Sequence, residues 1–330
     1  MSPPNNPQNQ QNFPTLEDFR KTRALLSPMV HQTPVWKWVR ENRLNEPAEV
    51  YLKLELFQKT GTFKVRGALN SLAQLSPDQL KPGVTTFSGG NHAIALSYAA
   101  QKFGASAKVV MPKSSNLTRK QLAQKYGAEV VLAQNIHEAF TLVKKIEQKE
   151  GRAFIHPFEG PSISFATGTI GLELCEQISN LDAVVVPIGG GGLCSGIATA
   201  VKLLQPSCKI YGIEPQGANS MQLSLRRGAP VQLKKVETIA DSLGSPSTAP
   251  YSFSLCRKYV DRVVIVNDED MKNAMRVLFS EMKLAVEPAG AASTAGLLGP
   301  LKNQFKGQKV ALIISGSNMD NLTYSRWLLP

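Results

Sequence analysis

Cysteine is scarce in this sequence. The four that occur are scattered, with no C-x-x-C pair and no histidine at the spacing of a metal site. Scattered cysteines are typical of free thiols in a reducing cytosol, whereas a zinc site needs closely spaced ligands. No apolar run approaches the roughly 20 residues that a helix needs to cross a bilayer. The sequence therefore predicts a cytoplasmic protein with neither a zinc site nor a membrane partner.

Acidic residues are also few: 25 stand against 37 lysines and arginines, which gives a formal net charge of +12. Such an excess occurs in nucleic-acid-binding proteins. The basic residues, however, are spread along the chain in runs no longer than two, without interleaved aromatic residues. We therefore predict a basic surface that suits small anionic ligands, and no nucleic-acid partner. A cofactor-free basic binding protein is the alternative from another functional class.

Residues 1–13 are rich in proline, asparagine and glutamine and have neither an apolar core nor a basic start. This composition predicts a short disordered tail and not a signal peptide. Further along, short apolar runs alternate with amphipathic segments, which is the pattern of βαβ units and a parallel sheet. The expected strands are 84–87, 108–111, 129–133, 183–188, 209–213, 262–266 and 310–315.

The later strands are apolar throughout, as expected where helices cover both faces of a sheet. The alternation predicts an α/β fold in which a small domain, residues 83–159, is inserted into a larger one made of residues 14–82 and 160–330. Ligands of open parallel sheets bind at the carboxyl ends of strands. The chemically distinctive segments of this chain all follow such ends or precede a predicted helix.

Four consecutive glycines, Gly189, Gly190, Gly191 and Gly192, are followed by Leu193 and lead from a strand into a helix. Backbone amides without side chains can surround a phosphate, and the helix N-terminus adds a favourable dipole. The dinucleotide pattern GxGxxG cannot be laid on this segment, and no lysine follows it as in a Walker loop. The segment predicts a phosphate cup, with a purely structural tight turn as the alternative.

Lys64 lies between an aromatic residue, Phe63, and the glycine-containing sequence VRGA. A lysine that forms a Schiff base needs a lowered pKa so that its amine is a nucleophile, and a desolvated site near other cations provides this. Any single lysine among so many basic residues is more commonly solvated surface. Lys64 is therefore a candidate only in combination with the other segments.

Ser88, Gly89, Gly90, Asn91 and His92 close the first strand of the small domain and open a helix. The free amides at such a junction form a natural cradle for a carboxylate. Asn91 as a plain helix N-cap is the alternative.

Ser315 follows the last apolar strand and begins the sequence S-G-S-N. Its hydroxyl at the end of a strand can face the ring nitrogen of a ligand. The commoner alternative is that it caps a turn.

Together these segments resemble the serine/threonine dehydratases and serine racemases, pyridoxal 5′-phosphate enzymes of fold type II. The family's (S/T)-F-K-x-R-G-A corresponds to residues 62–68, its S-x-G-N-H to 88–92, its glycine cup to 189–193 and its S-G-x-N to 315–318. Further matching segments are 156–158, 168–173, 214–215, 238–241 and 287–291. The resemblance runs in order from about residue 16 to 325. It implies two open, twisted, mostly parallel sheets with helices on both faces.

The resemblance also implies a role for each candidate residue. Lys64 would carry the cofactor as a Schiff base and, once freed, remove the α-proton of the substrate. Phe63 would lie against the pyridine ring, Asn91 would bind the 3′ oxygen of the cofactor, and Ser315 would face the ring nitrogen. Backbone amides would hold two anionic groups, the cofactor phosphate at Gly189–Leu193 and the substrate carboxylate at Ser88–His92.

The implied reaction is the elimination of water from L-threonine or L-serine, which gives 2-oxobutanoate or pyruvate and ammonia. A neutral serine beside the ring nitrogen should leave that nitrogen unprotonated, which favours elimination over transamination. The cofactor phosphate is the implied proton donor for the departing hydroxyl. The partners implied are a small amino-acid substrate and a second copy of the chain, as a homodimer.

The chain departs from the family pattern at three places. Racemases carry a serine as second base where this chain has Gly89, so racemisation is not expected. The family's cation site pairs a glutamate, here Glu214, with an aspartate six residues on, where this chain has Ser220. No cation is therefore assigned, and Glu214 is the one candidate ligand. The family's G-Q-G-T is A-T-G-T at 166–169, which points to an unusual substrate. The alternatives are a racemase and a dehydratase of 3-hydroxyaspartate or phenylserine.

Overall fold

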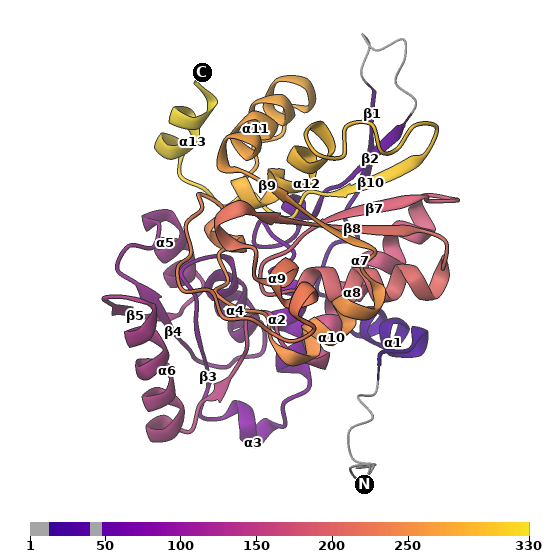
Figure 1. Cartoon of the computed structure of the whole chain (residues 1–330). Coiled ribbons are helices and arrows are strands. Elements are labelled where there is room, and N and C mark those ends of the chain that lie inside the picture. Colours follow the sequence, from indigo (N-terminus) through magenta and orange to yellow (C-terminus); the bar gives the residue numbers. More distant parts are fainter. Residues whose placement is uncertain (1–12, 40–47, 330) are drawn as a thin grey trace, which may run out of the picture.

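The computed structural model describes residues 13–39 and 48–329, which form two β-sheets (Figure 1). The larger sheet has six strands in the order β1-β2-β10-β7-β8-β9, and only the β1–β2 pair is antiparallel. Its strands are β1 (Val35–Trp38), β2 (Glu49–Lys53), β7 (Ala183–Pro187), β8 (Lys209–Pro215), β9 (Arg262–Val266) and β10 (Lys309–Ile313). The predicted α/β fold with mostly parallel sheets is confirmed.

The smaller sheet has four parallel strands in the order β5-β4-β3-β6. These strands are β3 (Val84–Phe87), β4 (Ala107–Pro112), β5 (Glu129–Ala133) and β6 (Ala153–Phe154). Side chains of β4 alternate between two apolar clusters, as the period of a strand requires. Val109 and Met111 pack with residues of α4 (Asn91–Lys102), whereas Val110 packs with residues of α6 (Ile136–Glu150). Helices therefore cover both faces of this sheet.

The larger sheet is also covered on both faces (Figure 1). Helices α11 (Asp268–Met282) and α12 (Pro288–Leu298) lie on one side. Helices α7 (Pro161–Gln177), α8 (Gly192–Leu204) and α10 (Pro250–Tyr259) lie on the other. Every residue of β7 is buried, which explains why this strand is apolar throughout.

The remaining helices connect and flank these layers. They are α1 (Leu16–Leu26), α2 (Lys64–Ala73), α3 (Pro77–Leu80), α5 (Leu117–Lys125), α9 (Ser220–Arg227) and α13 (Asn321–Leu328), with short 3₁₀ turns at Glu55–Phe57, Gln216–Ala218 and Asp241–Leu243. Helix α1 begins with a capping box in which Thr15 and Asp18 exchange hydrogen bonds. Within the described residues, no helix combines the length and the apolar character needed to cross a bilayer.

Two features differ from the sequence-based expectation. The edge strand β1 and its neighbour β2 were not predicted, because their residues are partly exposed and do not form a continuous apolar run. Phe13, assigned to the tail, is half-buried, and its ring meets that of Tyr259 edge-on at 6.3 Å. Residues 1–12, the rest of the predicted tail, lie outside the described residues.

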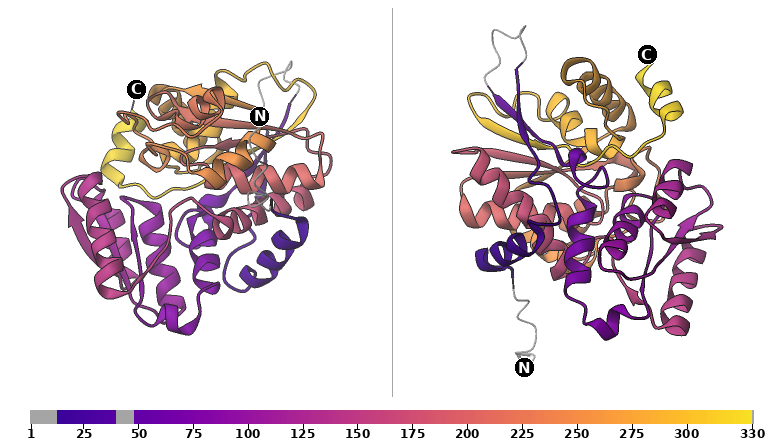
Figure 2. Two further views of the ribbon diagram at one scale, coloured as in Figure 1. Left: turned by 60° about the horizontal axis from the view of Figure 1, so that its bottom comes forward. Right: turned by 180° about the vertical axis from the view of Figure 1, so that it is seen from behind.

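The carboxyl ends of four strands turn toward the boundary between the sheets. Strand β3 ends at Phe87, β6 at Phe154, β7 at Pro187 and β10 at Ile313. Figure 2 shows the lobe around the smaller sheet beside the lobe around the larger one from two further directions. The loops that follow these strands therefore meet where the two lobes meet.

Candidate active site

The loops at the boundary enclose a cavity of about 430 Å³. Lys64 and the whole segment from Ser88 to His92 line it. A smaller recess, of about 30 Å³, opens beside it and shares Lys64 and Asn91. The recess is lined by the other predicted cofactor residues, namely Phe63, Gly189, Gly190, Gly191, Gly192, Leu193 and Ser315. The structure thus brings together every candidate residue of the cofactor and carboxylate sites.

Lys64 is the first residue of α2, and its Nζ donates a hydrogen bond to the Pro157 carbonyl oxygen at 2.6 Å. The same nitrogen lies 5.1 Å from the centre of the Phe63 ring. Burial lowers the pKa of the amine from its usual 10.5 to about 8, against the opposing charge of Glu287. A substantial fraction of Lys64 is therefore neutral, and so nucleophilic, near physiological pH.

Asn91 opens helix α4, and Gly90, not Asn91, occupies the N-cap position. The side-chain amide nitrogen of Asn91 donates to the Glu287 carboxylate at 2.7 Å and to Ser242 Oγ at 3.1 Å. Its Oδ1 accepts a hydrogen bond from Asn318 Nδ2 at 2.9 Å. The plain N-cap alternative therefore does not hold, and the Asn91 amide is held in a fixed orientation at the edge of the recess.

The carboxylate segment begins at the end of β3, where Ser88 Oγ accepts a hydrogen bond from the Gly90 amide at 3.2 Å. The His92 ring is buried, and its Nε2 lies 3.1 Å from the Ile155 carbonyl oxygen. Burial lowers the pKa of His92 to about 3, so the ring is neutral and donates to that carbonyl. The segment therefore offers an anion the amides of a helix N-terminus and no charged imidazole.

The glycine cup connects β7 to α8 and needs glycine for steric reasons. Gly191 has φ of +101°, in the left-handed region. A Cβ on Gly190 would lie 2.3 Å from the Phe158 ring, and one on Gly192 would lie 2.4 Å from the Phe158 carbonyl oxygen. The amides at the start of α8 have no acceptor within the helix. A Cβ at these positions would fill the cradle. Because glycine leaves it open, its free amides suit the phosphate of pyridoxal phosphate, beside the amine of Lys64.

Ser315 follows β10, is 3% exposed and lines the recess. Its Oγ lies 3.3 Å from the Ala289 carbonyl oxygen, which is a long hydrogen bond. A hydroxyl in this position can turn toward a ligand in the recess. The nearest acidic side chain of the recess, Glu287, is bound to Asn91 instead.

Glu287 and Arg119 contact the site but were not assigned a role from the sequence. Glu287 is 1% exposed, and burial raises the pKa of its carboxyl group. Arg119, from α5, donates to the Glu287 carboxylate at 3.2 Å, to the Asn318 carbonyl oxygen at 2.9 Å and to Asp241. Glu287 lies in the matching segment 287–291, but only the folded chain shows that it contacts Asn91 and Arg119. No local sequence signal singles out Arg119.

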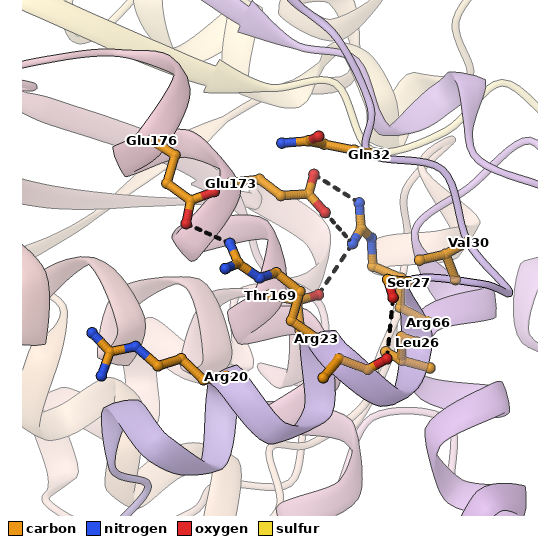
Figure 3. Close-up of a pocket in the computed structure, with 11 residues that line it drawn as sticks. Arg20, Arg23, Leu26, Ser27, Val30, Gln32, Arg66, Thr169, Glu173 and Glu176 are labelled. Atoms are coloured by element: carbon orange, nitrogen blue, oxygen red, sulfur yellow. Dashed lines mark hydrogen bonds and ion pairs between the residues drawn. The ribbon is translucent and has the colours of Figure 1, made fainter.

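Beneath α2 lies a buried network of charged residues centred on Arg66, which belongs to the same motif as Lys64. Arg66, 1% exposed, binds the carboxylates of Glu55 at 2.8 Å and Glu173 at 2.6 Å. Lys53, also buried, binds Glu173 at 2.6 Å. Figure 3 shows Arg66 and Glu173 at the rim of a second cavity, of about 510 Å³, between α1 and α7. The network ties the start of α2 to β2 and α7.

Glu214 lies away from the cavity, at the end of β8. Its carboxylate accepts hydrogen bonds from the amides of Met221 and Gln222 at 2.7 and 2.8 Å, at the start of α9. Burial raises its pKa to about 8. Among the described residues, no group of three or more histidine, cysteine, aspartate or glutamate side chains is arranged to hold a metal ion.

Comparison with known proteins agrees with this geometry. Residues 26–316 match the family described as pyridoxal-phosphate dependent enzyme. Phenylserine dehydratase from Ralstonia pickettii is 48% identical over 316 residues, which cover 96% of this chain and 97% of that protein. L-threonine ammonia-lyase from Thermotoga maritima is 40% identical, covering 93% of this chain and 76% of that protein. The structure of maize serine racemase is 33% identical, with a TM-score of 0.89 over 94% of this chain and 95% of that one.

Proposed function

Because the chain belongs to the pyridoxal-phosphate-dependent enzyme family of fold type II, we propose that it removes water from a β-hydroxy amino acid and releases a 2-keto acid and ammonia. The preferred substrate in this proposal carries an aromatic β-substituent, as in phenylserine. The bound cofactor supplies the electron sink that makes the α-proton of the substrate acidic. The amine of Lys64 takes that proton, and its lowered pKa, about 8, suits this task near neutral pH.

The other residues of the cavity bind and orient. The amides of Gly189–Leu193 would hold the cofactor phosphate, and Phe63, Asn91 and Ser315 would contact its ring. The segment Ser88–His92 would hold the substrate carboxylate at the N-terminus of α4. Gly89 has no side chain that can accept or deliver a proton, which supports elimination over racemisation.

The observation that carries the substrate assignment is an aromatic wall of the cavity. Phe87 and Phe140 both line it, with ring centres 3.9 Å apart. The ring of Phe154 lies nearly parallel to that of Phe87, with ring centres 6.2 Å apart. Phe140 is 41% exposed, so its ring is accessible to a ligand in the cavity. A substrate phenyl ring would cover these rings, and a methyl group would leave them in water.

The charges of the cavity argue against 3-hydroxyaspartate. A second carboxylate on the substrate needs an unpaired cation. Among the cations that line the described cavity, Lys64 is the reacting amine, and Arg119 is bound to Glu287 and Asp241. L-Threonine, the substrate first expected from the sequence, remains the second candidate because of the L-threonine ammonia-lyase among the relatives.

The test is a comparison of kcat/KM for release of keto acid from L-threo-phenylserine, L-threonine and L-serine, with chiral analysis of the remaining amino acid. We expect phenylserine to exceed threonine by at least about tenfold, the discrimination that one apolar pocket supplies. The variant Phe140→Ala should lower kcat/KM for phenylserine and leave that for threonine nearly unchanged. A wild-type preference for threonine would contradict the aromatic substrate. D-Enantiomer formed as fast as keto acid would contradict elimination.

The homodimer and the cytoplasmic location stay predictions.

A further inference from the structure

We propose that His156 binds the β-hydroxyl oxygen of the substrate through its Nε2–H and so holds the leaving group beside Lys64. This inference rests on the proposed function and assigns a role to a residue that the reaction has so far not used. His156 lies two residues after the end of β6 and lines the main cavity.

The tautomer of His156 follows from its backbone contacts. Its Nδ1 lies 3.2 Å from the Phe158 amide nitrogen and 3.0 Å from that of Glu159. Backbone amides only donate, so Nδ1 must be the acceptor and carries no proton. In a neutral imidazole the proton is then on Nε2. The two amide contacts therefore convert His156 into a hydrogen-bond donor of fixed orientation.

The ring is also neutral under working conditions. Burial, together with the nearby charge of Lys64, lowers the pKa of His156 to about 4. Among the described residues, Nε2 of His156 makes no hydrogen bond. A neutral N–H of this kind binds an oxygen but does not deliver a proton near pH 7.

The position of the ring selects the β-hydroxyl as its acceptor. The next residue, Pro157, supplies the carbonyl oxygen to which Lys64 Nζ is bound at 2.6 Å. The imidazole therefore lies next to the base that takes the α-proton. The β-carbon of the substrate is one bond from the α-carbon that carries this proton. The substrate carboxylate already has the amides at the start of α4. Phe154 and Phe158 hold the ring edge-on, with ring centres at 6.0 and 4.6 Å.

In this role His156 donates a hydrogen bond and transfers no proton. The Cβ–O bond breaks with its electron pair on oxygen, and the hydrogen bond from Nε2 disperses the charge that develops there. The α-proton that Lys64 accepts and the hydroxyl together account for the water that is lost. His156 ends in the tautomer in which it began.

Two variants separate this role from a structural one. In His156→Asn, Oδ1 takes the place of Nδ1 and still accepts from the loop amides, but no donor reaches the position of Nε2. In His156→Gln, the amide nitrogen reaches the position of Nε2, but the loop amides lose their acceptor. The proposal expects Gln to keep more dehydratase activity than Asn, and a purely structural role expects the reverse order.

The leaving group provides the decisive measurement. Chloride leaves β-chloro-L-alanine without help from a hydrogen-bond donor. We expect His156→Asn to lower kcat for phenylserine on the order of 10², and to change kcat for β-chloro-L-alanine by less than about threefold. The absorbance of the bound cofactor should be unchanged. Equal losses with both substrates, or Asn more active than Gln, would overturn the role.

A readout independent of turnover is ¹⁵N NMR of the histidine rings in the holoenzyme. His156 should be neutral with its proton on Nε2 from pH 6 to 8, and a protonated Nδ1 would overturn the inference. The proposed function fails separately: wild-type enzyme that releases pyruvate from β-chloro-L-alanine but acts on no β-hydroxy amino acid would contradict it. The NMR result would still decide the tautomer in that case.

Discussion

At the scale of single residues, the site depends on how burial changes the chemistry of common side chains. Lys53 is also buried, but its amine is paired with the Glu173 carboxylate, whereas the desolvated amine of Lys64 is bound to a carbonyl oxygen. His92 and His156 are both neutral for the same reason. Burial therefore creates a nucleophile and two uncharged rings within one cavity.

The lowered pKa of Lys64 predicts a pH dependence for its reaction with added cofactor. Only the neutral amine reacts, so the rate at which apoenzyme binds pyridoxal phosphate covalently should rise with pH through a midpoint of about 8 instead of 10.5. The Glu287 carboxylate raises the pKa of Lys64, so Glu287→Gln should move the midpoint lower. Stopped-flow absorbance measures both. A midpoint near 10.5 would contradict the assignment, as would borohydride labelling of another lysine.

At the scale of elements, the charged network beneath helix α2 anchors this helix. Its first residue, Lys64, is thereby held at the cavity. Glu173 binds both Arg66 and Lys53, and Glu55 supplies the second carboxylate; all four side chains are nearly inaccessible to water. Removing one partner from such a network leaves an uncompensated buried charge. By contrast, Glu176 binds Arg23 at the surface, on the next turn of the same helix (Figure 3).

This contrast gives a matched pair of substitutions. Glu173→Gln should lower the free energy of unfolding by about 3–5 kcal/mol. Glu176→Gln should lower it by less than about 1 kcal/mol, because exposed ion pairs contribute little. Urea denaturation followed by circular dichroism measures both values. Similar values for the two variants would show that the buried network does not anchor α2.

Most of the parallel strands were predictable because strands buried on both faces are apolar at every position, as β7 is. The glycine cup was predictable because any Cβ is excluded at Gly190 and Gly192. The hydrogen-bond partners of Asn91 were not predictable from the sequence. Glu287 and Asn318 are each far from Asn91 in the chain, so no periodicity or spacing links them. The tautomer of His156 likewise depends on contacts that only the folded loop makes.

At the scale of the whole molecule, Arg119 joins the two lobes. It belongs to α5 beside the smaller sheet, and its three acceptors, Asp241, Glu287 and Asn318, all belong to segments around the larger sheet. The side chain is 4% exposed and lines the cavity. The contact therefore holds α5 against the segments around the larger sheet.

Replacing Arg119 should loosen this boundary. We expect Arg119→Gln to raise KM at least about tenfold and to speed hydrogen exchange in α5, because a buried Glu287 loses its cation. Lys120→Gln, on the exposed side of the same helix, is the control, since Lys120 contacts only the Lys113 carbonyl oxygen in the described structure. Unchanged exchange in Arg119→Gln would mean that other contacts hold the lobes together.

The pairing of β2 with β10 has a consequence for the synthesis of the protein. Residues 49–53 take their parallel partner from residues 309–313. The larger sheet therefore cannot be completed until β10 has been synthesised. One edge of β2 stays unpaired for most of translation. Such long-range pairing also slows folding. Because Ser315 follows β10, the cofactor recess is complete only after translation has passed β10, and Lys64 is made long before that.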